Sequence, residues 1–304
     1  MYDVVIVGGG PAGLSAALVL GRCRRQVLVC DAGTPRNARS QALHGYLTRD
    51  GTSPLEFLRL GREELRAYGI EPRVATVTGI ERAPEGFEVI FQTAERVRAR
   101  AVLLATGVHD DVPTIPGVAE CYGISVHHCP YCDGWEARGK TIAVLGETTS
   151  PAGLALSLKT WSDNVIAFTN GRARVTAAQR RQLDVYGIGL EHGAIDRVAH
   201  DNGRLTAVIL SRGDAIPCDA MFFTAPQRQQ CNIARDLGCE FTRGGTVKTD
   251  NLGTTCVPDL YVVGDASRDV QFVVVAAAEG AKAGVAINQA LQRRAGLVAA
   301  KAAS

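Results

Sequence analysis

The sequence predicts an α/β protein made of two Rossmann-like dinucleotide-binding domains, with the second domain inserted in the first. Two observations predict this fold class. A strand–turn–helix–strand pattern occupies residues 2–31, and a second such pattern occupies residues 141–169. The length of 304 residues also allows about two domains of ordinary size.

Two further apolar strands indicate where the domains begin and end. The run Ala-Val-Leu-Leu-Ala leads into Thr106-Gly107, and Leu-Tyr-Val-Val leads into Gly264-Asp265, so the first domain resumes after the inserted one. The Ala-rich tail from 286 to 304 is expected to end a helix and then fray. The expected domains are 1–113 together with 246–304, and an inserted domain at 114–245.

The first pattern carries a glycine signature. Four β-branched residues lead into Gly-Gly-Gly-Pro-Ala-Gly, and apolar residues at helical spacing follow. In a G-x-G-x-x-G loop between strand and helix, the first glycine allows a tight turn, the second lets the backbone approach a pyrophosphate, and the third allows close helix–strand packing. An acid at the end of the second strand suits the hydrogen bonds of a ribose. The predicted dinucleotide-binding residues are Gly8, Gly10, Pro11, Ala12, Gly13 and Asp31.

Composition and charge argue against several classes of function. The 33 Lys and Arg nearly balance the 31 Asp and Glu, and a net charge of +2 gives no reason to expect a nucleic acid or an anionic membrane as partner. The first strand begins without a basic leader, and no apolar run of about 18 residues occurs. We expect a soluble, cytoplasmic protein whose nine cysteines are mostly buried free thiols, not the disulfide framework of a secreted domain.

One pair of cysteines, Cys129 and Cys132, has motif spacing and is followed directly by Asp133. Two thiols at this spacing close a small disulfide ring, and a polar or cationic neighbour lowers the pKa of one thiol enough for thiolate attack near neutral pH. A zinc site needs a second ligand pair, which the other seven cysteines do not supply. His127 and His128 adjoin Cys129 too closely to complete a tetrahedral set easily. Redox chemistry is therefore favoured over a metal site and over two inert buried cysteines.

Four motifs together resemble a known family. Gly-Gly-Gly-Pro-Ala-Gly at 8–13, Ala-Thr-Gly at 105–107, Cys-Pro-Tyr-Cys-Asp at 129–133 and Gly-Asp-Ala at 264–266 follow one another in this order. Their order and approximate separations resemble those of the low-molecular-weight thioredoxin reductases, which are FAD-dependent pyridine-nucleotide-disulfide oxidoreductases. The resemblance covers almost the whole chain, and four spaced motifs are far more specific than one.

The resemblance implies roles for the residues of the first domain. The glycine loop and Asp31 would hold the ADP half of FAD. Thr106 and Gly107 would mark the chain crossing between the domains. Gly264 and Asp265 would lie at the flavin, with Asp265 hydrogen-bonded to the ribityl chain; a helix cap is the alternative reading of Asp265.

The resemblance also implies roles for the cysteine pair. Cys132 would face the flavin, and Cys129 would attack the disulfide of a thioredoxin-like partner protein. Asp133 would act as proton donor or acceptor, although an acid before Gly134 also suits a turn. Members of the family are mostly homodimers, so a homodimer is expected.

The inserted domain departs from the family pattern. Conventional members carry a second glycine loop for the pyrophosphate of NADPH, whereas residues 146–152 read Gly-Glu-Thr-Thr-Ser-Pro-Ala. A β-branched side chain and an acid stand where the backbone should approach phosphate. Arg172 and Arg174 are candidate remnants of the segment that pairs the 2′-phosphate, and a solvated position is the favoured reading of both. We expect no functional NADPH site.

Two branches of the superfamily lack this site. One comprises dithiol oxidases that close disulfides in small molecules and pass electrons to O₂. The other comprises thioredoxin reductase-like flavoproteins that take electrons elsewhere, in some cases from ferredoxin. The oxidases tend to carry His directly after the pair, whereas this chain carries Asp133, as the reductases do; His127 and His128 remain alternative bases.

The sequence therefore predicts an FAD-dependent thiol–disulfide oxidoreductase that exchanges electrons with a thioredoxin-like protein without NADPH. The alternatives are a dithiol oxidase that acts on a small dithiol, a conventional NADPH-dependent thioredoxin reductase, and a flavin-bound redox sensor whose cysteine pair only switches conformation.

Overall fold

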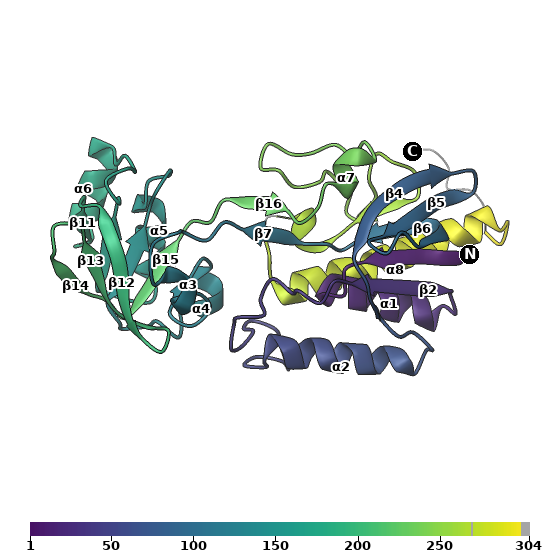
Figure 1. Ribbon diagram of the computed structural model, residues 1–304, viewed down its shortest axis with the longest axis horizontal. Helices are drawn as coiled ribbons and strands as arrows, with labels where there is room; N and C mark the ends of the chain where they lie inside the picture. The colour runs from purple at the N-terminus through teal and green to yellow at the C-terminus, as the bar shows by residue number, and fades with distance from the viewer. Residues whose placement is uncertain (269, 299–304) are drawn as a thin grey trace. The chain divides into compact units, whose positions relative to one another are not determined.

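The computed structural model describes residues 1–268 and 270–298, and the chain folds as two compact units (Figure 1). Each unit contains its own parallel sheet, as predicted. Unit 1 comprises residues 1–38, 45–109 and 227–304, and unit 2 comprises residues 39–44 and 110–226.

The central sheet of unit 1 has the strand order β3-β2-β1-β6-β5-β4, and β17 pairs with β6. Strands β1, β2, β3, β6 and β17 pair in parallel, while β4, β5 and the start of β6 form an antiparallel meander. The strands are β1 (Tyr2–Val7), β2 (Val27–Asp31), β3 (Arg73–Val74), β4 (Val77–Ala83), β5 (Gly86–Phe91), β6 (Arg96–Leu104) and β17 (Leu260–Val262).

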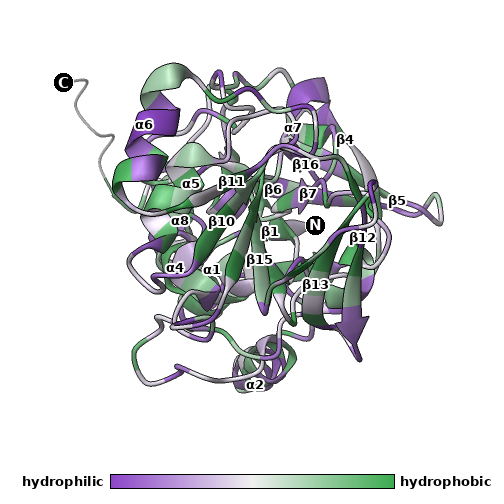
Figure 2. Ribbon diagram, turned by 90° about the vertical axis from the view of Figure 1, so that its left-hand side faces the viewer, coloured by the Kyte–Doolittle hydropathy of each residue, from purple (hydrophilic) through white to green (hydrophobic). Residues whose placement is uncertain are grey.

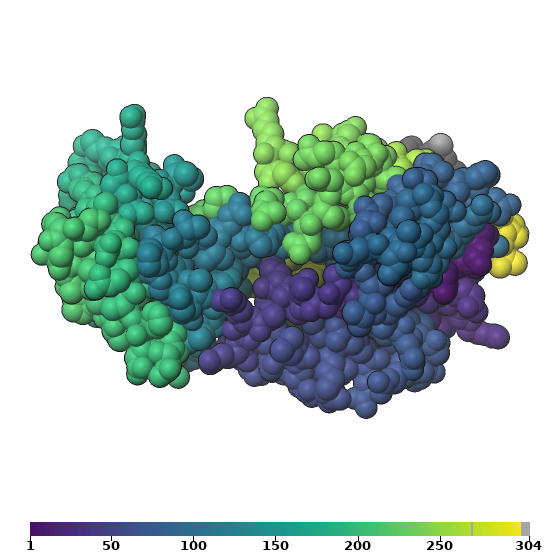
Figure 3. All heavy atoms as spheres, in the orientation of Figure 1, coloured from purple at the N-terminus to yellow at the C-terminus, as the bar shows by residue number. Residues whose placement is uncertain are grey.

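Helices cover this sheet because its parallel strands are apolar on both sides. Val4, Val5 and Ile6 of β1 are completely buried. Helices α1 (Pro11–Arg22) and α8 (Val273–Arg294) pack closely on one another beside the sheet. A Cβ added at Gly280 of α8 would lie 1.9 Å from the carbonyl oxygen of Ala12 of α1. Helix α2 lies at the surface of unit 1 (Figures 1 and 3). The helices of unit 1 are α1 (Pro11–Arg22), α2 (Pro54–Arg66), α7 (Ile233–Asp236), the 3₁₀ helix η1 (Gly264–Ala266) and α8 (Val273–Arg294).

Unit 2 is built on a five-stranded parallel sheet with the order β11-β10-β9-β15-β8, beside an antiparallel sheet of β12, β13 and β14. Figure 2 shows the contrast between the hydrophobic strand β15 and the largely hydrophilic helix α6. The strands are β8 (Val126–His127), β9 (Ile142–Leu145), β10 (Val165–Phe168), β11 (Gly189–Glu191), β12 (Ile195–Asp201), β13 (Arg204–Leu210), β14 (Ala215–Pro217) and β15 (Ala220–Phe223). The helices are α3 (Val118–Cys121), α4 (Pro130–Asp133), α5 (Ala152–Leu158) and α6 (Ala177–Val185).

The second domain boundary differs from the sequence prediction. The chain returns to unit 1 at residue 227, not near 246. The physical reason is packing, because Ile233, Ala234 and Cys239 join the same apolar core as β1 and β6. The first boundary falls at residue 110, close to the predicted 113, and β7 (Val108–Asp110) pairs there with β16 (Gln227–Gln229).

The C-terminal tail was expected to end a helix and fray. Helix α8 ends at Arg294, with Arg293 and Arg294 in its last turn. The part of this prediction that concerns residues 299–304 lies outside the described residues. No helix within 1–268 and 270–298 is long and apolar enough to cross a membrane.

Candidate functional site

The structure gathers the predicted nucleotide-binding residues at one edge of the unit 1 sheet. Strands β1, β2, β6 and β17 run parallel, so their carboxyl ends meet at the same edge. Ligands of open α/β sheets bind outside this edge. The residues that follow directly on these strand ends, or close them, are Gly8, Gly10, Pro11, Ala12, Gly13, Asp31, Thr106, Gly107, Gly264 and Asp265.

The space around the backbone differs among the three motif glycines of the first loop, Gly8, Gly10 and Gly13. Gly8 adopts φ +113°, and a Cβ there would lie 2.2 Å from the carbonyl oxygen of Ala105. At Gly13 a Cβ would lie 1.9 Å from the carbonyl oxygen of Gly8. At Gly10, in contrast, an added Cβ would meet nothing within 4 Å. The loop is therefore tight on its inner side and open on the outer side at Gly10.

The open side of the loop is the N-terminus of a long helix. Helix α1 has 12 residues and begins at Pro11. Among the described residues, no side chain forms a capping hydrogen bond at its N-terminus. Backbone N–H groups in the first turn of a helix lack partners within the helix and carry partial positive charge. This arrangement fits the diphosphate of a dinucleotide.

Asp31 closes β2 and is already oriented by two donors. Its Oδ1 accepts a hydrogen bond from the N–H of Gly33 at 3.0 Å, and its Oδ2 accepts one from Arg62 of α2 at 2.7 Å. The side chain is 17% exposed, so part of the carboxylate still faces solvent. Each carboxylate oxygen has two lone pairs, which leaves acceptor capacity for a ribose hydroxyl. A Cβ at Gly9 would lie 2.5 Å from Oδ2, a constraint that the sequence pattern did not reveal.

Thr106 and Gly107 connect β6 to β7. Gly107 adopts φ +68°, which favours glycine, and its carbonyl accepts a hydrogen bond from the N–H of Gln230 at 3.4 Å. Both residues therefore lie where the chain leaves unit 1, as the predicted crossing requires.

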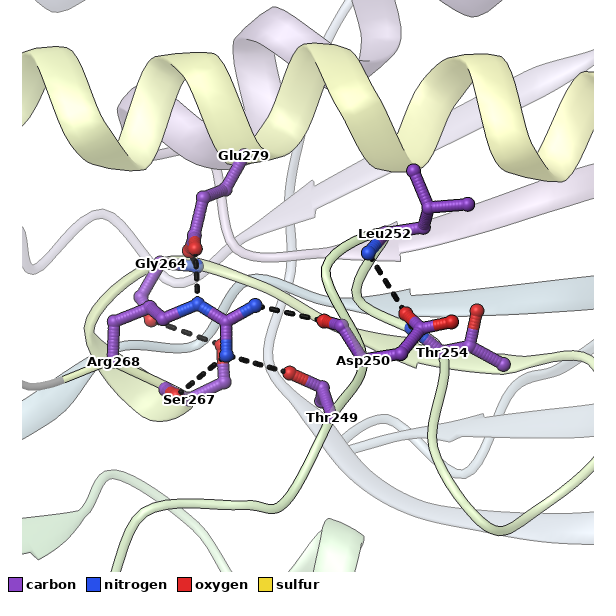
Figure 4. A network of polar contacts seen from close by, with 8 residues as sticks. All are labelled: Thr249, Asp250, Leu252, Thr254, Gly264, Ser267, Arg268 and Glu279. Atoms are coloured by element: carbon purple, nitrogen blue, oxygen red, sulfur yellow. Dashed lines mark hydrogen bonds and ion pairs between the residues drawn. The ribbon is translucent and has the colours of Figure 1, made fainter.

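The turn after β17 is held by a polar network (Figure 4). The N–H of Gly264 donates to Oε2 of Glu279 at 3.0 Å, and Oε1 of Glu279 accepts from Nε of Arg268. Arg268 also donates to the Thr249 hydroxyl at 3.0 Å and to the Asp250 carbonyl at 2.8 Å. The network fixes the backbone of η1, on which Asp265 lies.

Asp265 forms an ion pair that the sequence did not indicate. Arg36 donates to Oδ2 of Asp265 at 2.7 Å and to Oε1 of Gln271 at 2.7 Å. The Arg36 and Asp265 side chains are 19% and 22% exposed. The alternative reading of Asp265 as a helix cap is not what the structure shows, because no side-chain cap bond is formed at η1 within the described residues.

In unit 2, Cys129 and Cys132 form a disulfide with a Cα–Cα distance of 5.3 Å. Cys129 precedes the short helix α4, in which Pro130 is the first residue and Cys132 follows half a turn later. The N–H of Cys132 donates to the Cys129 carbonyl at 3.1 Å. Both cysteine residues are half-buried.

Asp133 contacts a histidine. Its Oδ1 lies 3.2 Å from Nδ1 of His127, and the two side chains are 21% and 10% exposed, respectively. The imidazole of His127 packs on the ring of Phe222 with centroids 5.4 Å apart. His128 is held differently, by a hydrogen bond between its Nδ1 and the Tyr122 hydroxyl at 3.0 Å. The candidate base His127 is therefore in contact with the acid that follows Cys132.

Comparison with known proteins decides the family. The family model described as "Pyridine nucleotide-disulphide oxidoreductase" matches residues 2–280. The chain belongs to this family. It is a thioredoxin reductase-like oxidoreductase, and the members of that group are flavoproteins.

Several relatives support this assignment. A "Probable thioredoxin reductase" of Arthroderma benhamiae is 30% identical over 88% of this chain and 74% of its own length. The crystal structure of a putative thioredoxin reductase from Bacillus anthracis has a TM-score of 0.92 and 32% identity, covering 97% of this chain and 100% of that one. The structure of HlmI has a TM-score of 0.92 and 36% identity, covering 97% of this chain and 93% of that one.

The free cysteines of this thioredoxin reductase-like protein are mostly buried, as predicted. Cys30, Cys121, Cys218 and Cys239 are buried, and burial raises the pKa of Cys30 and of Cys218 to about 12. These two thiols stay protonated near neutral pH and are poor nucleophiles. The exposed exceptions are Cys23 and Cys256.

The loop at residues 146–152, which follows β9, makes close contacts within itself. A Cβ at Gly146 would lie 2.5 Å from the carbonyl oxygen of Thr149 and 2.6 Å from Cδ of Pro151. Oε1 of Glu147 accepts a hydrogen bond from the Asn170 side chain at 3.1 Å. Pro151 has no N–H to offer, and α5 begins only after it. The space beside the first glycine is therefore filled by the loop itself.

Arg172 and Arg174, the candidate remnants of a 2′-phosphate site, are exposed. Neither side chain has a hydrogen bond or ion pair within the described part of the chain. They lie beyond the end of β10 as exposed side chains, and the absence of a 2′-phosphate site there stays a prediction.

Proposed function

We propose that this chain is an FAD-dependent thiol–disulfide oxidoreductase that exchanges electrons between flavin, the Cys129–Cys132 disulfide and a thioredoxin-like protein, without using NADPH. The observation that carries the proposal is the contrast within one chain. A cysteine pair with an acid beside it accompanies two unlike loops. The second glycine position is Gly10 in unit 1, where an added Cβ meets nothing within 4 Å, and Thr148, directly after Glu147, in unit 2.

The residues at the carboxyl edge of the unit 1 sheet would hold FAD. The first turn of α1 would bind the diphosphate, Asp31 the ribose of the ADP half, and Asp265 the ribityl chain. When bound, the flavin supplies an acceptor or donor for the electron pair that the disulfide exchanges. The contacts of Arg62 with Asp31 and of Arg36 with Asp265 would orient the two carboxylates.

The chemistry at the disulfide follows the rules of thiol–disulfide exchange. In the reduced pair, the Cys129 thiolate attacks one sulfur of the partner disulfide, which forms a mixed disulfide and releases a partner thiolate. The Cys132 thiolate then attacks Cys129, which re-forms the Cys129–Cys132 bond and releases the second partner thiolate. The partner gains two electrons and the pair loses two. Asp133 would take up and return the proton of the attacking thiol.

A protein partner is favoured by the surface beside the disulfide. Tyr131, between the two cysteines, is 72% exposed, and nearby Trp135 is 65% exposed. The Tyr131 ring packs edge-on against Trp161 at 5.6 Å, and the Arg138 guanidinium lies 4.2 Å from the Trp135 ring centroid. Exposed aromatic and Arg side chains are enriched in protein–protein interfaces. A second polypeptide would bury both rings while it reaches the disulfide.

Cys132→Ser tests the proposal. We expect the purified wild-type protein to contain FAD, and its flavin absorbance to bleach under anaerobic conditions when reduced thioredoxin is added. Cys132→Ser should keep its FAD and lose this bleaching, while the exposed-thiol control Cys23→Ser should behave as the wild type does. Normal bleaching in Cys132→Ser would overturn the role of the pair. Bleaching by a small dithiol but by no reduced thioredoxin would favour the dithiol oxidase instead.

A further inference from the structure

The imidazole of His127 is placed to control the charge beside the redox pair. His127 is the last residue of β8, and its Nδ1 is 3.2 Å from Oδ1 of Asp133, which directly follows Cys132. The two contacting residues flank the cysteine pair in the sequence, because His127 precedes Cys129 and Asp133 follows Cys132. Both side chains are largely buried, so water screens their interaction less than it would screen a surface pair.

One neighbour of the His127 imidazole is an uncharged ring. Strand β15 pairs with β8 and presents Phe222 to the imidazole. His128 is hydrogen-bonded to Tyr122.

The charged groups next to α4 are directed elsewhere. Glu136 contacts His44 at 3.6 Å, and Arg138 donates to the Trp135 carbonyl. Asp133 is a titratable side chain that the imidazole does contact.

We propose that His127 is a positioning residue for the redox pair, and that its protonation state sets the thiolate fraction of the reduced cysteines. The proposal rests on the proposed function of the same site. With a proton on His127, the pair with Asp133 is an imidazolium and a carboxylate, with no net charge. Without that proton, the pair carries one net negative charge next to Cys132.

This change of charge acts on the thiols by ordinary electrostatics. A negative charge nearby disfavours a thiolate and raises the pKa of the thiol, whereas a neutral ion pair does not. The reduced pair should therefore keep a larger thiolate fraction beside the ion pair than beside an unpaired carboxylate.

The proton balance of exchange supports the same role. When a partner dithiol reduces the disulfide, its first sulfur bonds to Cys129 and Cys132 leaves as a thiolate. Its second sulfur then displaces Cys129, so two electrons pass from the partner to the pair. The two protons lost by the partner's thiols are available to the departing thiolates, and the pair of Asp133 and His127 is placed to relay one of them.

His127→Asn separates charge from position. Asparagine keeps a nitrogen donor near the place of Nδ1 but cannot carry a proton charge. The measurement is the rate of alkylation of the reduced cysteine pair by iodoacetamide from pH 5 to 9, with the labelled cysteine identified by mass spectrometry. His192→Asn is the matched control, because His192 lies in the same unit but is bonded to Thr169 and Arg180.

We expect alkylation of His127→Asn to be several-fold slower than wild type at the acidic end of this pH range and equal to wild type at its alkaline end. The His192 control should follow the wild type throughout. A role in structure alone would change the rate by a similar factor at every pH, and that result, or superimposed profiles, would overturn the proposal.

A second variant tests whether misfolding of His127→Asn could explain the result. His127→Gln should give the same profile as His127→Asn, with far-ultraviolet circular dichroism unchanged in both. The proposed function is tested separately, because the wild-type disulfide must first exchange with reduced thioredoxin. Normal exchange with an unchanged profile in His127→Asn contradicts only the role of His127, whereas the absence of exchange in the wild type contradicts the proposed function.

Discussion

The two units of this protein use the same strand–turn–helix plan with different results at the turn. Strands β1 and β9 are both buried and parallel to their neighbours, and both lead through a glycine-containing loop into a helix. The first glycine is tight in both turns, because an added Cβ would lie 2.2 Å from the Ala105 carbonyl oxygen at Gly8 and 2.5 Å from the Thr149 carbonyl oxygen at Gly146. Two residues later the turns differ: an added Cβ at Gly10 would meet nothing within 4 Å, whereas unit 2 has Thr148 there. The comparison shows that the same strand–turn–helix plan forms with different residues in the turn, and on our proposal those residues decide which of the two turns binds a dinucleotide.

The largest effect is expected from filling the open loop. Gly10 has extended backbone angles (φ −77°, ψ −175°) that other residues adopt freely, so Gly10→Val should fold. Its side chain would project into the open space, and we expect the molar ratio of flavin to protein to fall at least about tenfold, an increment of about 1.4 kcal/mol in binding. The flavin absorbance of the purified variant measures this ratio.

The matched control for that variant is Gly153→Val in α5, where an added Cβ also meets nothing within 4 Å. Its flavin content should stay at the wild-type level. Full flavin in Gly10→Val would contradict the assignment of the first loop.

We expect a substitution at Gly13 to lower the flavin content less than Gly10→Val does, but to lower the stability of the fold clearly. An added methyl would lie 1.9 Å from the carbonyl oxygen of Gly8, so α1 must move away from β1. We expect Gly13→Ala to lower the free energy of unfolding by about 1–3 kcal/mol, as overpacking does, in spite of the higher helix propensity of alanine. Urea unfolding followed by circular dichroism measures it, and a variant as stable as the wild type would show that the packing is not as tight as described.

The second loop gives a prediction in the opposite direction. The triple variant Glu147→Gln, Thr148→Gly and Pro151→Ala removes the acid, the β-branched residue and the ring beside Gly146. We expect NADPH to bind this variant several-fold more tightly than the wild type, because backbone N–H groups become accessible to phosphate. Fluorescence titration with NADPH compares the two proteins, and equal affinities would mean that the loop does not control the site.

The smallest effect concerns a property that the two units share. Burial raises the pKa of Cys30 in unit 1 and of Cys218 in unit 2 from the ordinary 9.0 of a cysteine thiol to about 12. Because the folded-state pKa is raised, the unfolded chain loses the thiol protons first, and stability falls as pH rises from about 9 towards 12. The loss at pH 10 should be about 1.4 kcal/mol for each thiol.

Urea unfolding at pH 7.5 and pH 10 measures this loss, with Cys30→Ala and Cys218→Ala as controls that each remove one contribution. An identical pH dependence in the wild type and in both variants would contradict the assignment to these thiols.

Much of unit 1 was predictable because its signals are local. The β-branched run before Gly8, the glycine spacing and the acid at Asp31 are neighbours in sequence, and the structure places each where the pattern indicated. The cysteine pair was predictable for the same reason, because Cys129 and Cys132 close a ring within one turn.

The remaining features depend on residues distant in sequence. Arg36 meets Asp265 and Arg62 meets Asp31 only through tertiary folding, and no spacing rule connects them. The boundary near residue 227 follows from apolar side chains such as Ile233 that join the unit 1 core, although the strand signal of that domain returns only at residue 260. His127 was noticed as a possible base, but its contact with Asp133 required the packing of β8 against β15.

The central claim is that the flavin exchanges electrons with the cysteine pair and not with a bound nicotinamide. Anaerobic stopped-flow mixing of the yellow protein with excess NADPH, with NADH and with reduced thioredoxin tests it most directly. The account predicts that flavin absorbance persists for minutes with either nicotinamide and bleaches with reduced thioredoxin. Bleaching by NADPH within seconds would contradict the account and show that the loop from Gly146 to Ala152 admits a pyrophosphate.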